Sequence, residues 1–310
     1  MSRSLLYLRR DEVAGLLPPV EEQLDLVEAT YRALAAGRVE LPPKPGVHPR
    51  NDSFLHAMPA YLADDDVVAL KWVSGYPANK ARGLPYISGL VVLNDAETGL
   101  PIAVMDAAEI TAARTAAASG VCVRRWGPQG WRSAAILGCG EQGVFHARLL
   151  RALNPDVHIC AYDPNGERVA RLGPDVEAAP NELSAVEGAD VVVTGAPIVS
   201  DPDPVVEAAS LTEPWLLLPI DFDALVRRDA VEAADVFAVD DVGQFEYYRA
   251  QGHFRDWPAP HGTVGELLPR EGGASRVACV NLGVGALDAA FAAHVLEAAR
   301  EACVGLELPL

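Results

Sequence analysis

The chain is poor in cysteine, and its few cysteines fit neither a metal site nor a disulfide framework. Five occur in 310 residues, an odd number without any C-x-x-C spacing: Cys122, Cys139, Cys160, Cys279 and Cys303. That pattern argues against the usual zinc motifs and predicts reduced thiols in a cytoplasmic protein without a bound metal.

Cationic residues and long apolar runs are scarce as well. The 25 Lys and Arg residues are outnumbered by 43 Asp and Glu. The net charge of −18 argues against nucleic acid as a partner, because the phosphate backbone would be repelled. The most apolar long stretch, 277–296, is interrupted by Asn281, Asp288 and His294. We therefore expect a buried strand–turn–helix segment there and no membrane span.

A dinucleotide-binding fingerprint lies halfway along the chain. An apolar run, 134–137, leads straight into Gly138-Cys139-Gly140-Glu141-Gln142-Gly143. Asp163 ends the next apolar run, twenty residues after the last of those glycines. A strand, a G-x-G-x-x-G turn, a helix, a second strand and a terminal acid are the parts of a nucleotide-binding βαβ unit.

Each part of the fingerprint has a mechanical reason. Gly138 permits a tight turn, Gly140 lets the backbone approach a pyrophosphate, and Gly143 lets the helix pack close to the strand. The amides and the dipole at the start of that helix favour the phosphates. Asp163 is expected to bind the ribose hydroxyls and to repel a 2′-phosphate, which favours NAD over NADP, although Arg168 lies within reach.

The chain on either side of the fingerprint differs in character. Downstream, strand-like runs at 134–138, 157–162, 190–194, 215–220 and 236–239 alternate with helical runs at 142–153, 166–172, 204–210 and 244–250. This alternation predicts a Rossmann fold, an α/β class built on a doubly wound parallel sheet. Upstream, a helix at 20–36 precedes hairpin-like runs between 54 and 105. That part is predicted to be an α+β unit.

The predicted domain boundaries follow from the positions of two helices. A long helix, 108–124, is expected to carry the chain from the α+β unit into the Rossmann domain. The last helix, 284–303, is expected to pack back onto the α+β unit. We therefore predict one domain at 1–115 with 286–310, and a second, NAD-binding domain at 116–285.

Two cations occupy unusual places. Lys71 lies inside the apolar run 67–73, where it is either a solvated edge residue or an ammonium directed into a cleft. A buried ammonium needs a counter-charge or loses its proton. Arg114 is the cation of a helix rich in small residues, and it either points outward or enters a cavity. Its fork suits a carboxylate or a phosphate.

The motifs around these residues resemble the ornithine cyclodeaminase/mu-crystallin family. The resemblance is dense over about 40–165, with fainter similarity at 265–267 and 283–288. The matching motifs are 57–61 (AMPAY), 71–79 (KWVSGYPAN), 83–85 (GLP), 94–95 (ND), 98–101 (TGLP), 105–107 (MDA), 110–111 (IT), 114–117 (RTAA) and 138–142 (GCGEQ).

The resemblance implies a substrate-binding and dimerisation domain, an NAD-binding Rossmann domain, and hydride chemistry at Cα of a small L-amino or imino acid. It implies that Lys71 and Arg114 hold the substrate carboxylate, with Lys71 near the reacting carbon, and that Asp221 serves as acid or base. A homodimer is expected. The residues predicted to contact the cofactor are Thr115, Gly138, Gly140, Glu141, Gln142, Gly143, Asp163 and Thr194.

Two departures from the family pattern bear on the substrate. Lys44 stands where many relatives have an arginine that also binds the carboxylate, and a lysine offers no bidentate fork. His56, which is also predicted to contact the substrate, stands where cyclodeaminases often have a glutamate. A histidine there could still relay a proton near neutral pH, but it would not recognise a substrate ammonium as a carboxylate does. Both departures favour an amino-acid dehydrogenase or imine reductase. An ornithine- or lysine-type cyclodeaminase and a mu-crystallin-like binding protein without turnover remain alternatives.

Overall fold

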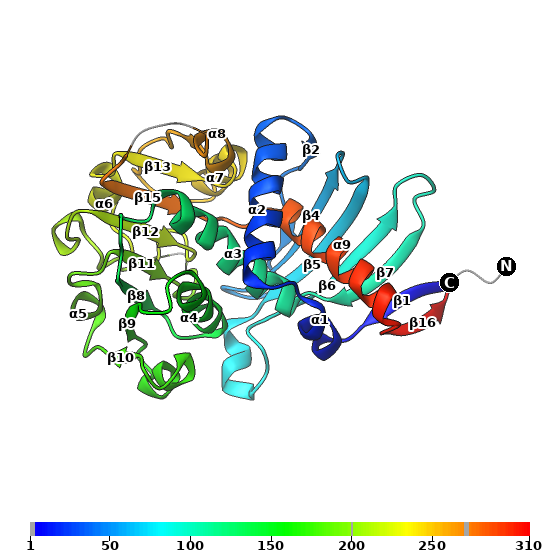
Figure 1. Cartoon of the computed structure of the whole chain (residues 1–310), viewed down its shortest axis with the longest axis horizontal. Coiled ribbons are helices and arrows are strands. Elements are labelled where there is room, and N and C mark those ends of the chain that lie inside the picture. The colour runs from blue at the N-terminus through cyan, green and yellow to red at the C-terminus, as the bar shows by residue number, and fades with distance from the viewer. Residues whose placement is uncertain (1–3, 200, 270–272) are drawn as a thin grey trace. The chain divides into compact units, whose positions relative to one another are not determined.

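The computed structural model describes residues 4–199, 201–269 and 273–310, which form two compact units (Figure 1). Unit 1 combines the chain up to Arg114 with Gly283–Leu310, and unit 2 is Thr115–Leu282. Helix α3 (Ala108–Trp126) runs across the boundary, so that Arg114 is assigned to unit 1 and Thr115 to unit 2. Among the described residues, no helix is both long and apolar enough to cross a bilayer.

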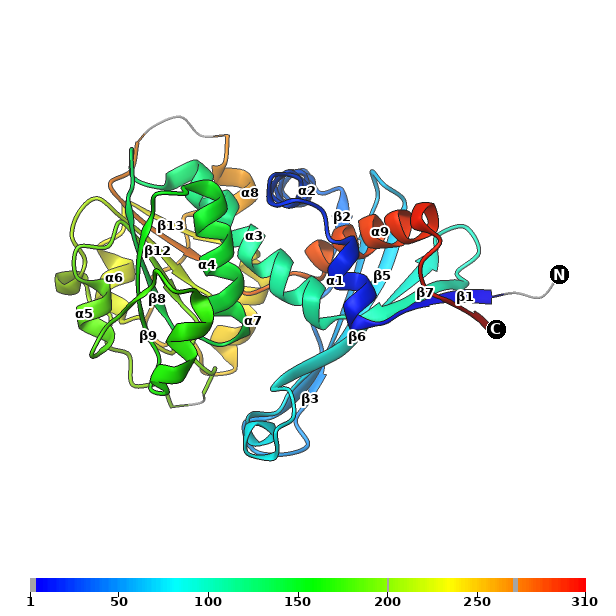
Figure 2. The same ribbon diagram turned by 60° about the horizontal axis from the view of Figure 1, so that its bottom comes forward.

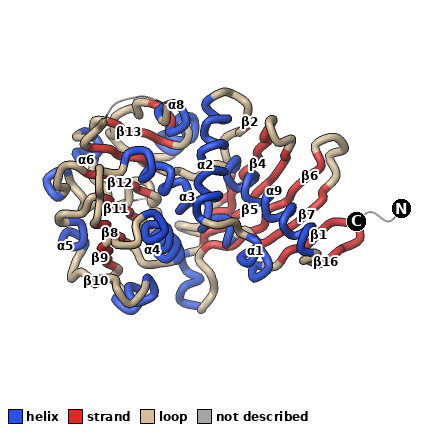
Figure 3. Tube along the Cα trace, viewed as in Figure 1, coloured by secondary structure: helices blue, strands red, loops and turns tan. Residues whose placement is uncertain are grey.

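Unit 1 is built on a mixed sheet that is mostly antiparallel, and its strands are coloured red in Figure 3. Its order is β16-β1-β7-β6-β5-β4-β2, with β3 also paired to β4; β1 and β7 run parallel and the other neighbours antiparallel. The strands are β1 (Ser4–Leu8), β2 (Val39–Glu40), β3 (Gly46–Val47), β4 (Phe54–Leu62), β5 (Val67–Gly75), β6 (Ile87–Asp95), β7 (Pro101–Asp106) and β16 (Leu306–Pro309).

Three helices cover one face of this sheet: α1 (Arg10–Leu16), α2 (Val20–Ala35) and α9 (Gly285–Ala302) (Figure 2). Helix α9 packs across β4, β5 and β6 with a largely apolar surface. Because side chains alternate along a strand, Ala69, Lys71 and Val73 of β5 point to the covered face and are buried. Trp72, between them, belongs to the open face. A short 3-10 helix, Pro77–Arg82, links β5 to β6.

Unit 2 is a parallel sheet in the order β10-β9-β8-β11-β12-β15-β13-β14. The predicted fold class, a Rossmann doubly wound sheet beside an α+β domain, is confirmed. The strands are β8 (Ser133–Leu137), β9 (His158–Tyr162), β10 (Glu177–Ala178), β11 (Val191–Thr194), β12 (Trp215–Pro219), β13 (Val236–Val239), β14 (Gly262–Thr263) and β15 (Arg276–Val280).

The helices of unit 2 match the sequence pattern in part. The predicted helices at 142–153 and 244–250 are α4 (Glu141–Leu153) and α7 (Val242–Ala250), whereas 166–172 forms a 3-10 helix. The prediction for 204–210 is wrong, since only Ala208–Ser210 turns as a 3-10 helix. Val206 instead bridges to Val226, and its amide donates to the Leu225 carbonyl. The remaining helices are α5 (Glu182–Val186), α6 (Arg228–Glu232) and α8 (Val264–Leu267).

Candidate active site

The glycine turn after β8 requires glycine at two positions and leaves room at a third. Gly138 has a φ of 96°, and a Cβ there would lie 2.4 Å from the carbonyl oxygen of Gly195. A Cβ on Gly143 would lie 2.5 Å from the Gly138 carbonyl oxygen, so the start of α4 sits directly against the turn. A Cβ on Gly140 would meet nothing within 4 Å. The open space at Gly140 is the place that a phosphate group needs.

The start of helix α4 has the character of an anion site. Gly140 is its N-cap residue, and glycine has no side chain with which to cap this end. The amides of a first helical turn have no carbonyl partner within the helix, and the helix dipole is positive there. Together with the open space at Gly140, this end of α4 fits the pyrophosphate of a dinucleotide.

Asp163 follows β9 and is held beside the glycine turn. Its Oδ2 accepts a hydrogen bond from the Cys139 amide at 2.9 Å, and its Oδ1 accepts one from the Asn165 amide at 2.9 Å. The Arg168 guanidinium lies 3.6 Å from Oδ1. The carboxylate is thus fixed at the end of the second strand, as the fingerprint requires, and Arg168 pairs with it.

Asp221, which follows β12, joins Thr194 in a second buried group of unit 2. Thr194 Oγ1 donates to Asp221 Oδ1 at 2.5 Å, and the Ala196 amide donates to Oδ2 at 2.9 Å. Burial raises the pKa of Asp221 to about 7, although both hydrogen bonds favour the ionised form. A carboxyl group with this pKa exchanges protons near neutral pH.

The residue after Asp221 is conformationally strained. Phe222 has a φ of 62°, in the left-handed region that bulky side chains rarely occupy. Its ring packs against Tyr248 and Phe254, with centroids 4.7 and 5.3 Å away. These aromatic contacts stabilise the left-handed backbone next to Asp221.

The other residues predicted to contact the cofactor also belong to unit 2. Thr115 is buried in α3, and Glu141 is exposed at the start of α4, 3.9 Å from the Arg171 guanidinium. The backbone carbonyl of Gln142 lies 2.8 Å from His146 Nδ1. Their contribution to cofactor binding stays a prediction.

In unit 1, Lys71 and Arg114 meet at a single carboxylate. Lys71 Nζ donates to Asp288 Oδ1 at 2.7 Å and to Thr111 Oγ1 at 3.3 Å. Arg114 Nε donates to the same Asp288 oxygen at 3.1 Å. The side chains of Lys71 and Asp288 are each 1% exposed and that of Arg114 is 7% exposed. We call Lys71, Arg114 and Asp288 the cation cluster. Of the two interpretations of Lys71, the structure selects the inward-facing one.

The loop before α9 completes the surroundings of this cluster. Gly283 has a φ of 82°, and a Cβ there would lie 2.8 Å from Arg114 Nη1, so the backbone and the guanidinium are in close contact. The Gly283 carbonyl accepts a hydrogen bond from Lys44 Nζ at 3.0 Å. The chain has only three lysines, Lys44, Lys71 and Lys80, and the first two are buried here. Lysine is rarely buried unless it is paired.

His56 lies on β4, within electrostatic range of these lysines. Its ring stacks on Phe54, with centroids 4.4 Å apart. Burial, followed by the charges of Lys44 and His48, lowers the pKa of His56 to about 4. The imidazole is therefore neutral at pH 7 and carries no negative charge for a substrate ammonium.

The charges around the cation cluster do not balance. Burial and the neighbouring Arg114 lower the pKa of Lys71 to about 7, while Asp288 opposes that change. Burial disfavours the ionised carboxylate, but Arg114 and Lys71 outweigh it and hold the pKa of Asp288 below its usual range. Among the described residues, the charges that act on Lys71 are those of the cations Arg114 and Lys44 and of the anion Asp288. The excess of positive charge suits an incoming carboxylate.

Asp288 was missed as a site residue at the level of sequence. It is the acid in the first turn of the otherwise apolar start of α9, and a buried acid in such a segment needs a cationic partner. That signal was available, but it did not identify the partners, because Lys71 lies 217 positions earlier.

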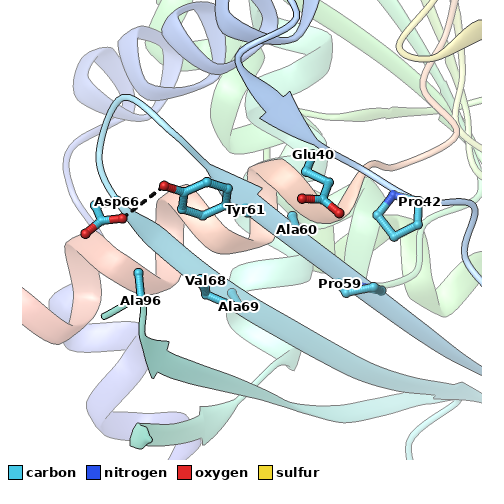
Figure 4. A pocket seen from close by; sticks show the side chains of 9 residues that line it. All are labelled: Glu40, Pro42, Pro59, Ala60, Tyr61, Asp66, Val68, Ala69 and Ala96. Atoms are coloured by element: carbon cyan, nitrogen blue, oxygen red, sulfur yellow. Dashed lines mark hydrogen bonds between the residues drawn. The ribbon is translucent and has the colours of Figure 1, made fainter. Parts of the chain in front are cut away.

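A hollow of about 400 Å³ in unit 1 is distinct from the cation cluster (Figure 4). It lies over β4 and β5 and is lined by Glu40, Pro42, Pro59, Ala60, Tyr61, Asp66, Val68, Ala69 and Ala96. The Tyr61 hydroxyl donates to Asp66 at its edge. The lining includes no cationic side chain, so this hollow lacks the chemistry to bind a carboxylate.

Comparison with known proteins assigns the chain to a family. The sequence profile described as the ornithine cyclodeaminase/mu-crystallin family matches residues 6–224. The chain belongs to this family. The nodulation efficiency protein NfeD of Rhizobium meliloti is 36% identical over 96% of this chain and 97% of its own length.

Solved structures agree in fold over nearly the whole chain. The Δ1-pyrroline-2-carboxylate reductase of Thermococcus litoralis, solved with NADH and L-proline, has a TM-score of 0.86 and 25% identity, covering 98% of this chain and all of that one. An archaeal alanine dehydrogenase dimer with bound NAD also has a TM-score of 0.86, with 27% identity over 99% of this chain and all of that one.

Proposed function

We propose that this protein is an NAD-dependent oxidoreductase that acts at the Cα of a small L-amino or imino acid, as a dehydrogenase or an imine reductase. The observation that carries the proposal is the buried cation cluster of unit 1, whose positive charge exceeds its negative charge. Membership of the family and the intact nucleotide fingerprint of unit 2 support it.

The substrate carboxylate is assigned to Lys71 and Arg114, with Lys44 as a third contact. The Arg114 fork supplies directional hydrogen bonds, and the two ammonium groups add charge in surroundings from which water is excluded. Fixing the carboxylate also fixes the adjacent Cα, which lowers the entropic part of the barrier.

NAD is assigned to the glycine turn of unit 2. The amides at the start of α4 would hold its pyrophosphate, and Asp163 would accept hydrogen bonds from its adenosine ribose. When bound, NAD supplies the hydride acceptor or donor for Cα. The two related structures with bound NADH and NAD support this cofactor.

Proton transfer at the substrate nitrogen is assigned to Lys71 or Asp221. Both side chains have a pKa of about 7, so each exchanges a proton readily at neutral pH. In the oxidative direction one of them takes a proton from the substrate amine, and in the reductive direction it returns that proton.

The alternatives differ in the fate of the iminium formed by oxidation. Attack by water on the iminium gives a keto acid and ammonia. Attack by the substrate's own side-chain amine expels ammonia and leaves a cyclic imine, and return of the hydride to Cα then gives the cyclic amino acid, as in a cyclodeaminase. The neutral His56 favours the first outcome, because it offers no carboxylate for a side-chain ammonium. A binding protein without turnover would have no use for acid–base groups with pKa values near 7.

The open face of the unit 1 sheet supports a homodimer. Trp72 and Leu90 are opposite one another on β5 and β6, and each is 42% exposed. Adjacent exposed apolar side chains mark an association surface. Light scattering should give about twice the chain mass of 32.9 kDa, and Trp72→Asp with Leu90→Asp should give a folded monomer. Leu183→Asp, at an exposed leucine of unit 2, is the matched control.

A reducing, cytoplasmic location is also proposed. All five cysteines are free thiols, and four of them are buried or half-buried. Free thiols persist in a reducing compartment.

Absorbance of NADH, measured with a panel of L-amino acids and NAD and with cyclic imino acids and NADH, tests the function. We expect turnover with at least one pair, and a loss of about 100-fold or more in kcat/KM for Lys71→Ala. Lys80→Ala, at an exposed lysine, should retain activity. Equal activity of Lys71→Ala and wild type would refute the role of Lys71, and tight NAD binding without any turnover would favour a binding protein.

A further inference from the structure

The acid that holds the cation cluster together has a role beyond those assigned so far. We propose that Asp288 is a positioning residue for the carboxylate site: it anchors Lys71 and Arg114 side by side and favours the ammonium form of Lys71 before the substrate binds. This inference rests on the proposed function only in naming the ligand. The arrangement of the three side chains is supported by the contacts among them, whatever the ligand is.

The first support is geometric. One oxygen of Asp288 receives both Lys71 Nζ, at 2.7 Å, and Arg114 Nε, at 3.1 Å. The two cations come from β5 and α3, which are separate elements, and Asp288 comes from the first turn of α9. Like charges repel, so an anion between the two cations is needed to hold them close together. A carboxylate shared in this way fixes the spacing of the two donors.

The second support is the cost of the arrangement. Asp288 Oδ2 is buried and has no hydrogen-bond partner among the described residues. An unpartnered buried carboxylate oxygen is destabilising, and a hydrophobic residue would pack better at an ordinary core position. The charge that Asp288 supplies to two buried cations explains why an acid is present. Its place in the first turn of α9 further favours the ionised form.

The third support is the balance of charge on Lys71. The charged or titratable groups that act on it come from every side: Arg114 from α3, Lys44 from the loop before β3, His56 from β4 and Asp288 from α9. Two of these groups are cations, His56 is neutral at pH 7, and Asp288 is the one that favours the protonated lysine. Removing its charge leaves buried cations that repel each other, so Lys71 should release its proton more readily.

Asp288→Asn tests the proposal, because it keeps the shape of the side chain and removes the charge. The chain has three lysines, so selective ¹³C labelling at lysine Cε should give three resonances, with Lys71 assigned through Lys71→Arg. In the wild type the Lys71 signal should titrate near pH 7. In Asp288→Asn its proton affinity should fall about tenfold, and the exposed Lys80 should not change.

Glu297→Gln is the matched control, since it neutralises an exposed acid on the same helix. It should leave the Lys71 titration where it is in the wild type. An unchanged Lys71 titration in Asp288→Asn would overturn the proposal. The NMR measurement does not use turnover, so it tests this inference separately from the proposed function. Absence of activity with every amine and imine would refute the proposed function without affecting the Lys71 titration. An unchanged Lys71 titration would refute this inference without affecting the proposed function.

Kinetics add a second readout once a substrate is found. We expect Asp288→Asn to raise the KM for the amino acid about tenfold at pH 7 and to leave the Kd for NAD unchanged, because NAD is assigned to unit 2. Asp288→Glu, which retains the charge, should recover part of the loss. A uniform loss of kcat at every pH, without a change in KM, would contradict a positioning role.

Asp288→Asn leaves two buried cations without an anion, which destabilises the folded state. The proposal can still be tested if the variant does not fold. In that case Lys71→Met combined with Asp288→Asn should fold, because one of the repelling charges is gone. Urea unfolding of the two single variants and the double variant should show that their effects are not additive. A double variant that also fails to fold would show that Asp288 acts through packing, and would overturn the proposal.

Discussion

The anion sites proposed in the two units are built by opposite means. The proposed site of unit 2 uses backbone: a glycine leaves open space at the start of α4, and the peptide amides of the first helical turn are assigned to the ligand. Unit 1 uses charged side chains, buried and paired with Asp288. A backbone site costs no desolvation of ionised groups, whereas the unit 1 site must hold like charges together. The comparison predicts that unit 2 is sensitive to added atoms and unit 1 to changes of charge and shape.

Gly140→Ala should weaken the binding of NAD to unit 2, and its effect should be the largest of the four. The added methyl group meets no protein atom, so folding stability should stay close to that of the wild type, yet the methyl fills the space assigned to the pyrophosphate. We expect the Kd for NADH, measured by fluorescence titration, to rise about 100-fold, or about 2.7 kcal/mol. Gly166→Ala, also in open space but outside the turn, is the control. Equal affinity in both variants would contradict the assignment.

Arg114→Lys should weaken the binding of the substrate carboxylate to unit 1 without affecting the binding of NAD to unit 2. Lysine retains the charge but not the fork that grips a carboxylate. We expect kcat/KM for the amino acid to fall about 50-fold, mainly through KM, with an unchanged Kd for NADH. Steady-state kinetics check this, with Arg300→Lys, an exposed arginine on α9, as control. A change in kcat alone would show that Arg114 does not bind the ground-state substrate.

Asp221→Asn sharpens the comparison, because Asp221 is an ionisable group buried in unit 2. The folded state raises the pKa of Asp221 to about 7, so its contribution to stability is present below about pH 4 and is lost as pH rises through 7. The Asn side chain does not ionise, so the variant does not lose this stability as the pH rises. Its stability relative to the wild type should increase by about 2 kcal/mol between pH 4 and pH 6, measured by urea unfolding. A pH-independent difference would refute the raised pKa.

Asp163→Asn should have the smallest effect of the four. The change removes the charge that repels a 2′-phosphate and releases Arg168, which lies 3.6 Å from Asp163. We expect the preference for NAD over NADP, measured as a ratio of kcat/KM values, to fall about tenfold, or about 1.4 kcal/mol. An unchanged ratio would mean that another part of unit 2 selects the cofactor.

The same contrast explains how much the sequence revealed. The turn at Gly138, Gly140 and Gly143 was predictable because the requirement for glycine is local and its spacing is visible. The helix predicted at 204–210 was wrong because Val206 pairs with Val226, a contact that local propensity does not contain.

Lys71 and Arg114 stood out as cations in apolar or small-residue segments, which made them candidates. Their common partner did not, because Asp288 comes from the last helix and only the fold brings it to β5 and α3. A buried charge can be suspected from a sequence. Its partner is set by tertiary structure.

Transfer of deuterium from Cα to NAD tests the central claim most directly. The enzyme is incubated with NAD and an active L-amino acid deuterated at Cα, and the NADH is analysed by mass spectrometry. The account predicts NADH that carries one deuterium per turnover, with release of unlabelled product. NADH without deuterium, or product formed with the deuterium returned to Cα, would contradict a dehydrogenase and indicate another reaction.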